Sequence, residues 1–551
     1  MGLAEEARIS LLAAEENQNE NISSSTSVLK QQTGGWKASS LILFTELCVC
    51  IVIFGILKNL VVYLKTELLE DNVTAATHAS TWLGSYFLAP LIGAYVSDSY
   101  WGNYLTIMSF CVINFAGMVT FTLSTSLSIL KHSSFFTFFS LYMISLGSGS
   151  IQPCLSAFGA DQFDTADRKA KASFFSWYYL SIKIGLVFSS TVILWIQDNY
   201  GWTIGFSILT LLSGIACVGL MAGSRHYRYC KPSGSPFTRI CQVIVAASRK
   251  YKLDLPEDYS LLYQEKGEPA IVQDNKGSER TPEFSFLDKA AIVAPSDFSC
   301  TDALSPWRLC TMLQVEELKS ILRLLPVWAT FILFASVSSQ ESSVFVEQGM
   351  VMDRHFGSLN IPAASLSSFN VLAVVVFAPI YDKIIVPVAC RITKTEGGMS
   401  HLQRAGIGLL FSILAMLSAT IVETKRLQIA SDEGLTHQNV AVPMSVFWQI
   451  PQYVLVGIGE VFNQIGMLDF FYDQAPDSMR SLCLALSLLT VSLGSYVTSV
   501  VLTVVNGVTR WIPENLNEGH LDRFFLLFAG LSLFNLVVFA YCASRYRYKK
   551  K

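Results

Sequence analysis

The sequence predicts an all-α polytopic membrane protein with twelve transmembrane helices in two six-helix bundles, and three observations lead to this prediction. Of the 551 residues, 52% are hydrophobic and only 15% are charged, whereas soluble domains carry roughly a quarter charged residues. Twelve apolar runs approach the roughly 20 residues that cross a bilayer as a helix. A polar stretch over residues 223–320 divides these runs into six and six.

The apolar runs define the expected order of elements along the chain. We place the first six at 41–64, 80–97, 103–123, 135–158, 173–196 and 202–222. The second six are placed at 321–339, 362–386, 404–423, 443–472, 481–506 and 522–543. The expected segments are therefore an acidic tail over 1–40, an N-terminal bundle over 41–222, a central loop over 223–320, a C-terminal bundle over 321–543 and a basic tail over 544–551.

The distribution of Lys and Arg predicts the orientation of the chain. Cations gather in alternate loops, for example Arg168 to Lys171, and in the central stretch and the basic tail. Cytosolic loops carry this excess of cations. Both termini are therefore expected in the cytosol, and the polar, acidic start of the chain does not have the pattern of a signal peptide.

Several classes of function are disfavoured by composition and motifs. A net charge of −3 provides no basic field for nucleic acid. No Gly-rich loop ends in Gly-Lys-Ser or Gly-Lys-Thr, and the cysteines lie mostly inside apolar runs rather than at metal-ligand spacing. We therefore expect no enzyme activity, no cofactor and no metal site, which leaves a secondary transporter.

An internal echo indicates a duplication. Gly93–Asp98 joins the second and third runs, and Ala378–Lys383 occupies the corresponding joint between the eighth and ninth. Six plus six helices with such a joint in each half is the architecture of the major facilitator superfamily. Asp98 and Asp382 are accordingly interpreted as gating residues at a rocking joint.

Ionisable side chains inside apolar runs are functional candidates because they are costly in hydrocarbon. Glu46, Lys183, Glu341 and Glu460 are such residues. Glu460 begins the series Glu460, Asn463, Gln464, Met467, whose spacing of i, i+3, i+4, i+7 defines one helical face. A polar face on a spanning helix is expected to point into a bundle or a watery cavity. The alternative for each residue is a structural contact between helices.

Long motifs resemble the plant nitrate/peptide branch of the proton-coupled oligopeptide transporter family. They are Phe158–Asp164, Phe174–Tyr179, Phe286–Ala291, Trp307–Cys310, Gln314–Lys319 and Phe470–Asp477. Two further segments, Lys231–Pro236 and Gly519–Asp522, look like those of the di- and tripeptide carriers of this branch. The resemblance implies a carrier that moves its cargo by alternating access and is driven by protons.

The resemblance also assigns roles to individual residues. It implies that Glu460 receives the amino group of a peptide and that Tyr86 and Asn370 face the cavity. Gln152 stands where the family usually has a lysine, and Asn463 shares the polar face of Glu460. These residues, together with Lys183, are the predicted substrate-binding set.

The first helix departs from the family pattern. Only Glu46 remains of the usual Glu-x-x-Glu-Arg, because Val49 and Cys50 replace the second acid and the arginine. Lys183 lies where the family usually has an asparagine, and our hypothesis is that it recognises the carboxylate of the cargo or pairs with Glu46. The remaining candidates for proton coupling are Glu46, Glu341 and Glu460.

The sequence thus favours a proton-coupled di- or tripeptide transporter. One alternative keeps the class and changes the cargo to nitrate, an organic anion or a hormone. A second alternative is a transport-inactive sensor or regulatory subunit. The expected partners are the cargo, protons and the lipid bilayer, and we expect a monomer. A near-match to an acidic dileucine signal, Glu6 to Leu12, favours the vacuolar membrane over the plasma membrane.

Overall fold

The structure is a computed structural model, and it describes most of the chain. The described residues are 34–127, 133–163, 167–229, 236–255, 262–263, 283–293, 305–357, 359–393, 399–474 and 480–546. The dileucine-like stretch Glu6 to Leu12 and most of segment Lys231–Pro236 lie outside these residues.

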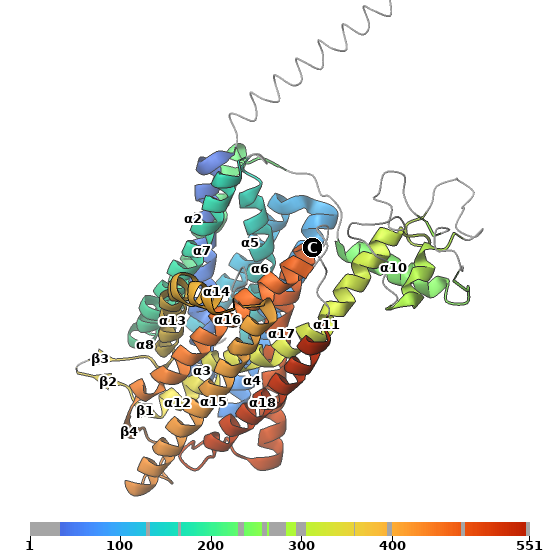
Figure 1. Cartoon of the computed structure of the whole chain (residues 1–551). Helices are drawn as coiled ribbons and strands as arrows, with labels where there is room; N and C mark the ends of the chain where they lie inside the picture. The colour runs from blue at the N-terminus through green and yellow to red at the C-terminus, as the bar shows by residue number, and fades with distance from the viewer. Residues whose placement is uncertain are drawn as a thin grey trace, which may run out of the picture.

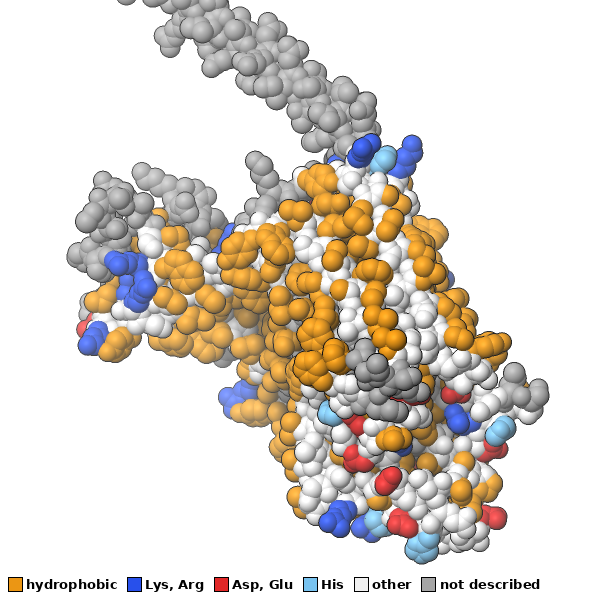
Figure 2. All heavy atoms as spheres, turned by 180° about the vertical axis from the view of Figure 1, so that it is seen from behind, with side chains coloured by type: hydrophobic (Ala, Val, Ile, Leu, Met, Phe, Trp, Pro, Cys, Tyr) orange, Lys and Arg blue, Asp and Glu red, His pale blue; other side chains and the backbone are white. Residues whose placement is uncertain are grey.

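The structure confirms the predicted helical membrane fold. Ten stretches are long and apolar enough to span a bilayer. One of them, Asn72–Ser126, holds two helices, and α16 (Ile450–Gln474) adds another, which gives the twelve predicted helices. Apolar side chains cover much of the outside of the bundle, whereas charged side chains gather toward its ends (Figure 2).

The N-terminal half forms the first group of helices. Its α-helices are α2 (Gly35–Leu57), α3 (Leu60–Glu67), α4 (Asn72–Val96), α5 (Gly102–Ser126), α6 (Ser134–Ala160), α7 (Arg168–Phe188), α8 (Leu194–Tyr200) and α9 (Trp202–Ala222). Shorter helical turns are η1 (Ser97–Trp101), η2 (Ser189–Ile193) and η3 (Gly223–His226). Aromatic side chains such as Trp82, Phe121 and Phe206 fill the core of this half.

The C-terminal half repeats the arrangement. Its α-helices are α11 (Met312–Ser339), α12 (Val344–Met350), α13 (Ser368–Ile380), α14 (Val386–Thr393), α15 (His401–Asp432), α16, α17 (Arg480–Thr509) and α18 (Leu521–Arg545). Its shorter turns are η7 (Gln340–Ser342), η8 (Ala363–Ser367), η9 (Tyr381–Ile385) and η10 (Val446–Gln449). Capping boxes begin two of the helices, with Thr311 and Gln314 at α11 and Ser400 and Gln403 at α15.

Four short strands mark one end of the bundle (Figure 1). Strand β1 (Met352–Asp353) pairs in parallel with β4 (Val442–Ser445), and β2 (His355–Phe356) pairs antiparallel with β3 (Leu359–Asn360). We call this the strand end. The opposite end, where α2 begins and α18 ends, is the terminal end.

The first spanning segment is broken in its last third, between α2 and α3. The Asn59 N–H bonds the Ile56 carbonyl at 3.2 Å. The Gly55 carbonyl instead accepts a hydrogen bond from the Gln197 side-chain amide at 3.0 Å, so a buried backbone oxygen is satisfied by another helix. Asn59 in turn donates to Gln197 at 3.0 Å. This break positions Lys58, which the next subsection places at the cavity.

The central segment is more ordered than the expected polar loop. It contains α10 (Pro236–Arg249) and η5 (Ser285–Ala291), and α11 begins at Met312, ahead of the predicted residue 321. Apolar residues of these elements and of α11 share one cluster. At its edge the Lys319 ammonium lies 2.5 Å from Asp288 and 2.9 Å from Glu316, and Lys319 and Asp288 are fully buried. Apolar packing and paired charges therefore fasten α10 and η5 to the C-terminal half.

Candidate functional site

A cavity of about 280 Å³ lies between the two halves of the molecule. Its size is close to the lower end of the roughly 300–1,000 Å³ of small-molecule sites. Helices α2, α4 and α7 line it from the N-terminal half, and α11, η7, α13, α16 and α17 line it from the C-terminal half. The interface between repeats is where transporters of this architecture bind cargo.

The N-terminal wall is apolar apart from two ammonium groups. Leu57 and Phe87 are among its apolar side chains, and Lys58 and Lys183 supply the charges. The Lys183 ammonium lies 5.1 Å from the centroid of the Tyr179 ring, which is within cation–π range. Lys183 forms no ion pair with Glu46 or any other acid within the described part of the chain.

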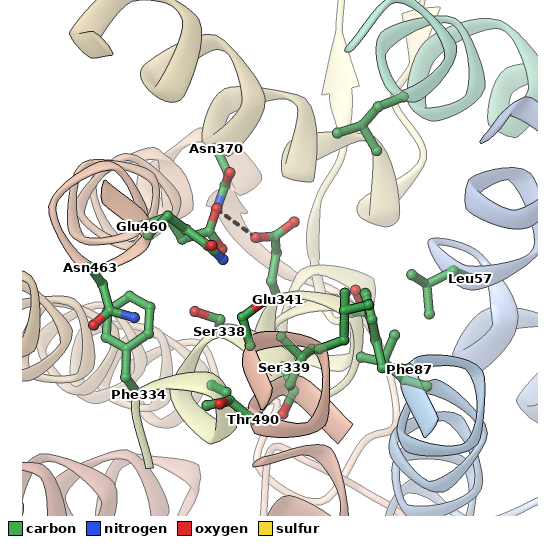
Figure 3. A pocket seen from close by; sticks show the side chains of 18 of the residues that line it. Leu57, Phe87, Phe334, Ser338, Ser339, Glu341, Asn370, Glu460, Asn463 and Thr490 are labelled. Carbon is green, nitrogen blue, oxygen red and sulfur yellow. Dashed lines mark hydrogen bonds between the residues drawn. The ribbon is translucent and has the colours of Figure 1, made fainter. Parts of the chain in front are cut away.

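The C-terminal wall carries most of the polar groups of the cavity (Figure 3). Glu341 from η7, Asn370 from α13, and Glu460 and Asn463 from α16 converge on the cavity. Asn370 donates a hydrogen bond from Nδ2 to Glu341 Oε2 at 2.7 Å. Ser and Thr side chains of α11, η7 and α17 complete this wall.

An ion pair crosses between the two walls. The Lys58 ammonium contacts Glu341 Oε1, and the two side chains are only 8% and 7% exposed. The two oxygens of Glu341 therefore have different partners, with Lys58 from the N-terminal half on one and Asn370 from the C-terminal half on the other. Breaking such a buried pair by removing one partner is costly, because the remaining charge is left in a low-dielectric site.

The polar face predicted on the tenth spanning helix lies along the cavity. Glu460, Asn463, Gln464 and Met467 all belong to its lining. Two successive turns of α16 therefore present these four side chains to the space between the halves, as the i, i+3, i+4, i+7 spacing predicts. Their roles in binding remain predictions.

Three predicted site residues lie away from the lining and form a separate buried cluster. Glu46 is 1% exposed and accepts a hydrogen bond from Cys50 Sγ at 3.4 Å. The Tyr86 hydroxyl donates to Gln152 Oε1 at 3.5 Å, and the Tyr178 hydroxyl donates to the Gln152 carbonyl at 3.4 Å. Tyr86 and Gln152, which the sequence predicts to bind cargo, contact one another outside the lining of the cavity, and their roles in binding stay predictions.

The two predicted gating acids occupy matching positions. Asp98 lies in η1 and Asp382 in η9, and both are π-helical segments that directly follow the second spanning helix of their half, α4 and α13. Beside Asp98, the Ser97 hydroxyl donates to Asn103 Oδ1 at 2.6 Å, and Asn103 donates to Asp161 at 3.3 Å. These contacts tie the joint of the N-terminal half to the end of α6. The Asp382 side chain lies outside the described part of the structure.

Sequence reasoning missed several buried charges. Lys58 lies inside the first predicted run, so its position alone made it a candidate. The Glu423 and Arg426 side chains are fully buried in α15 and bond each other at 2.7 and 3.0 Å. Glu347 in α12 is also fully buried. Within the described residues there is no group of His, Cys, Asp and Glu that could hold a metal ion.

Hydrogen bonds between the halves cluster toward the strand end. Thr81 donates to Ser499 at 3.0 Å, Ser492 donates to the Gly84 carbonyl at 2.7 Å, and the Ser85 and Tyr496 hydroxyls are 3.0 Å apart. A Cβ on Gly84 would lie 3.0 Å from the Tyr496 ring, so α4 and α17 touch closely here. These contacts close the cavity on the strand side.

Comparisons with known proteins agree on one family. The sequence profile of the POT family matches residues 104–516. The chain is 47% identical over 545 residues to Protein NRT1/PTR FAMILY 8.3 of Arabidopsis thaliana, covering 95% of this chain and 93% of that protein. It is also 47% identical over 544 residues to Protein NRT1/PTR FAMILY 8.1 of the same plant, covering 95% of each.

Solved structures show the same fold. An auto-inhibited POT family peptide transporter superposes with a TM-score of 0.73 at 21% identity, covering 93% of this chain and 97% of that one. The POT family transporter PepTSo superposes with a TM-score of 0.71 at 22% identity, covering 93% and 98%.

Proposed function

The chain belongs to the POT family, and we propose that it carries di- or tripeptides across a membrane by proton-coupled alternating access. The observation that supports this cargo most directly is the distribution of charge around the cavity. Two ammonium groups line it from one half, and two carboxylates line it from the other. A zwitterionic peptide carries both complementary charges at its two ends.

Pairing within the cavity leaves one charge of each sign for the cargo. Lys58 and Glu341 neutralise each other. Lys183 and Glu460 then remain, on opposite walls. In our proposal the peptide carboxylate binds Lys183 and the peptide amino group binds Glu460, so that no buried charge is left uncompensated. Asn463 lies one turn from Glu460 and would hydrogen-bond the peptide.

The closed strand side suggests how access alternates. With α4 and α17 in contact, cargo would reach the cavity from the terminal end. Rocking of the halves would then open the strand side and separate Lys58 from Glu341. A proton on Glu341 would remove the attraction that holds this pair, which makes Glu341 a candidate proton carrier. In this proposal Glu460 would exchange its proton when cargo binds, and Glu46 remains a further candidate.

Nitrate is the second candidate cargo, and two observations favour it. The relatives are named for both nitrate and peptide transport, through NRT1 and PTR. Lys183 has no acid partner within the described residues, so a small anion could bind this ammonium without using Glu460.

Counterflow in proteoliposomes tests the proposed cargo. Proteoliposomes preloaded with unlabelled dipeptide should accumulate a labelled dipeptide from outside. Excess unlabelled dipeptide in the outside medium should reduce this uptake, and nitrate should not. Glu460→Gln should reduce dipeptide affinity by roughly 10- to 100-fold, because a hydrogen bond to a charged group contributes about 1.5–3 kcal/mol. Glu514→Gln, at an exposed residue, is the matched control.

Other outcomes of this experiment would change the assignment. Nitrate flux that a dipeptide does not inhibit would favour the second candidate. Binding of a dipeptide without any flux would instead support a sensor or regulatory subunit.

We place the protein in the vacuolar membrane as a monomer with both termini in the cytosol, and the plasma membrane is the alternative. The cationic loops and the dileucine-like stretch of the acidic tail support this placement. A fluorescent fusion at either terminus should label the vacuolar boundary, and replacement of Leu11 and Leu12 by alanine should redirect it.

A further inference from the structure

Glu347 is a fully buried acid that the transport cycle proposed above does not use. It lies in α12 near the strand end, and its side chain is 0% exposed. Neither carboxylate oxygen accepts a hydrogen bond from any residue that the structure describes. A buried carboxylate without a donor is strongly disfavoured in its ionised form, whereas the neutral acid needs far less solvation.

A neighbouring acid shows how the same region accommodates a permanent charge. Glu423 is also 0% exposed, but it accepts hydrogen bonds from Arg426 Nε at 3.0 Å and from Arg426 Nη2 at 2.7 Å. Gln348, the residue after Glu347, donates a further bond to Glu423 at 2.9 Å. Glu423 therefore has a full set of partners for an ionised carboxylate, and Glu347 has none of them.

The surroundings of Glu347 link it to the contact between the halves. Helix α12 packs against α3 of the other half. The charged groups that face Glu347 are Lys65 of α3 and Asp71 from the turn before α4. Lys65 donates to Asn72 Oδ1, and Asn72 Nδ2 donates to the carbonyls of Pro513 at 2.6 Å and Glu514 at 3.0 Å. Lys65 is thus engaged in a network that joins the two halves.

Within the described residues, the other elements packed against α12 offer Glu347 no counter-ion, since Arg426 of α15 is already paired with Glu423. Turn η8 has no titratable residue. Turn η7 carries Glu341, which is paired with Lys58. Strand β1 carries Asp353, whose pKa is lowered by hydrogen bonds from the backbone and side chain of His355. Asp353 therefore stays ionised and cannot share the role of Glu347.

We propose that Glu347 is a proton-binding site at the strand end, which holds its proton while the halves are closed there and releases it when they part. Separation of α3 from α12 would admit water to the carboxylic acid, and the O–H proton would pass to that water. Reclosure would require the carboxylate to take a proton from the strand side. This inference rests on the proposed alternating access, and it adds a proton site that is distinct from the cargo cavity.

Infrared difference spectroscopy tests the protonation directly, without any cargo. In the purified protein near neutral pH, Glu347→Gln should remove a protonated-carboxyl band that the exposed control Glu433→Gln retains. Glu347→Asp keeps a carboxylic acid, and it should shift the band rather than remove it, which gives a second measurement if the glutamine variant folds poorly. Identical bands in wild type and a folded Glu347→Gln would overturn the proposal.

Transport measurements test whether the proton on Glu347 is coupled to cargo accumulation. A gradient that is acidic on the strand side should stimulate accumulation by the wild type and by Glu433→Gln. In Glu347→Gln this stimulation should fall, because one of the proton sites is lost, whereas counterflow without a gradient should persist. Full stimulation in Glu347→Gln would overturn the proposal. A wild type that carries no tested cargo would refute the proposed function alone, since the infrared result would still decide the proton site.

Discussion

The N-terminal half lines the cavity with apolar side chains and two ammonium groups, whereas the C-terminal half adds carboxylates, amides and hydroxyls to its own apolar lining residues. Neither wall is electrically neutral by itself. Charge compensation in the cavity therefore requires both halves, through Lys58 and Glu341, or a cargo that spans them. The Glu423 and Arg426 pair differs, because both members lie in α15 and stay together however the halves move. The position of a buried ion pair relative to the moving interface thus decides whether it can take part in transport.

The largest expected effect comes from breaking the pair that crosses the halves. Lys58→Met should leave the Glu341 carboxylate buried without its cation and lower the free energy of unfolding by about 3–5 kcal/mol. Removing both charges in Lys58→Met with Glu341→Gln should recover most of this loss. Denaturant unfolding in detergent measures the free energy of unfolding of each variant. Lys425→Met, at an exposed residue, is the control. A double variant as unstable as the single one would show that the pair does not compensate its charges.

An intermediate effect is expected at Lys183, the cation of the N-terminal wall that has no acid partner within the described residues. Lys183→Gln should weaken dipeptide binding by roughly 10- to 100-fold, because one charged hydrogen bond to the cargo carboxylate is lost. A dipeptide with an amidated C-terminus should bind wild type and variant almost equally. The comparison is made by competition in counterflow, with Lys169→Gln on the exposed start of α7 as control. Equal loss of affinity for both peptides would place Lys183 away from the carboxylate.

The smallest effect is expected at a surface pair between the halves. Arg354 lies 4.0 Å from Asp198, and the two side chains are 29% and 23% exposed. Arg354→Ala should change the free energy of unfolding by less than about 1 kcal/mol, because solvent and salt screen the pair. Thermal unfolding at low and high salt measures the change. A loss comparable to that of Lys58→Met would mean that this pair also controls closure of the strand end.

Hydrophobicity and spacing predicted the fold because a bilayer imposes length and apolarity on each helix. The face of α16 was predictable for a related reason, since helical periodicity fixes the relative directions of Glu460 and Asn463 on a single element. Tyr86 and Gln152 show the limit, because which neighbour each side chain meets depends on how α4 and α6 rotate against one another. That rotation is set by packing across many residues and is not encoded in local spacing.

The missed charges have a different origin. Lys58 was visible inside an apolar run, but its partner Glu341 is distant in sequence. Glu347 gave no periodic signal, since it lies in a short helix after a turn. Lys58 is identified by its ion pair with Glu341, and Glu347 by the absence of a hydrogen-bond donor among the described residues. Neither property can be read from a sequence pattern.

Because α10 and η5 pack against α11, part of the chain that connects the two halves is fixed to the C-terminal half. The sequence predicted this stretch, residues 223–320, as a polar central loop between the two bundles. Among the residues of this stretch that the structure describes, η5 is paired with α11 through Asp288 and Lys319, and α10 shares an apolar cluster with both elements. A ligand or modification that separates α10 and η5 from α11 would lengthen the connection between the two bundles and thereby change how far they can move relative to one another.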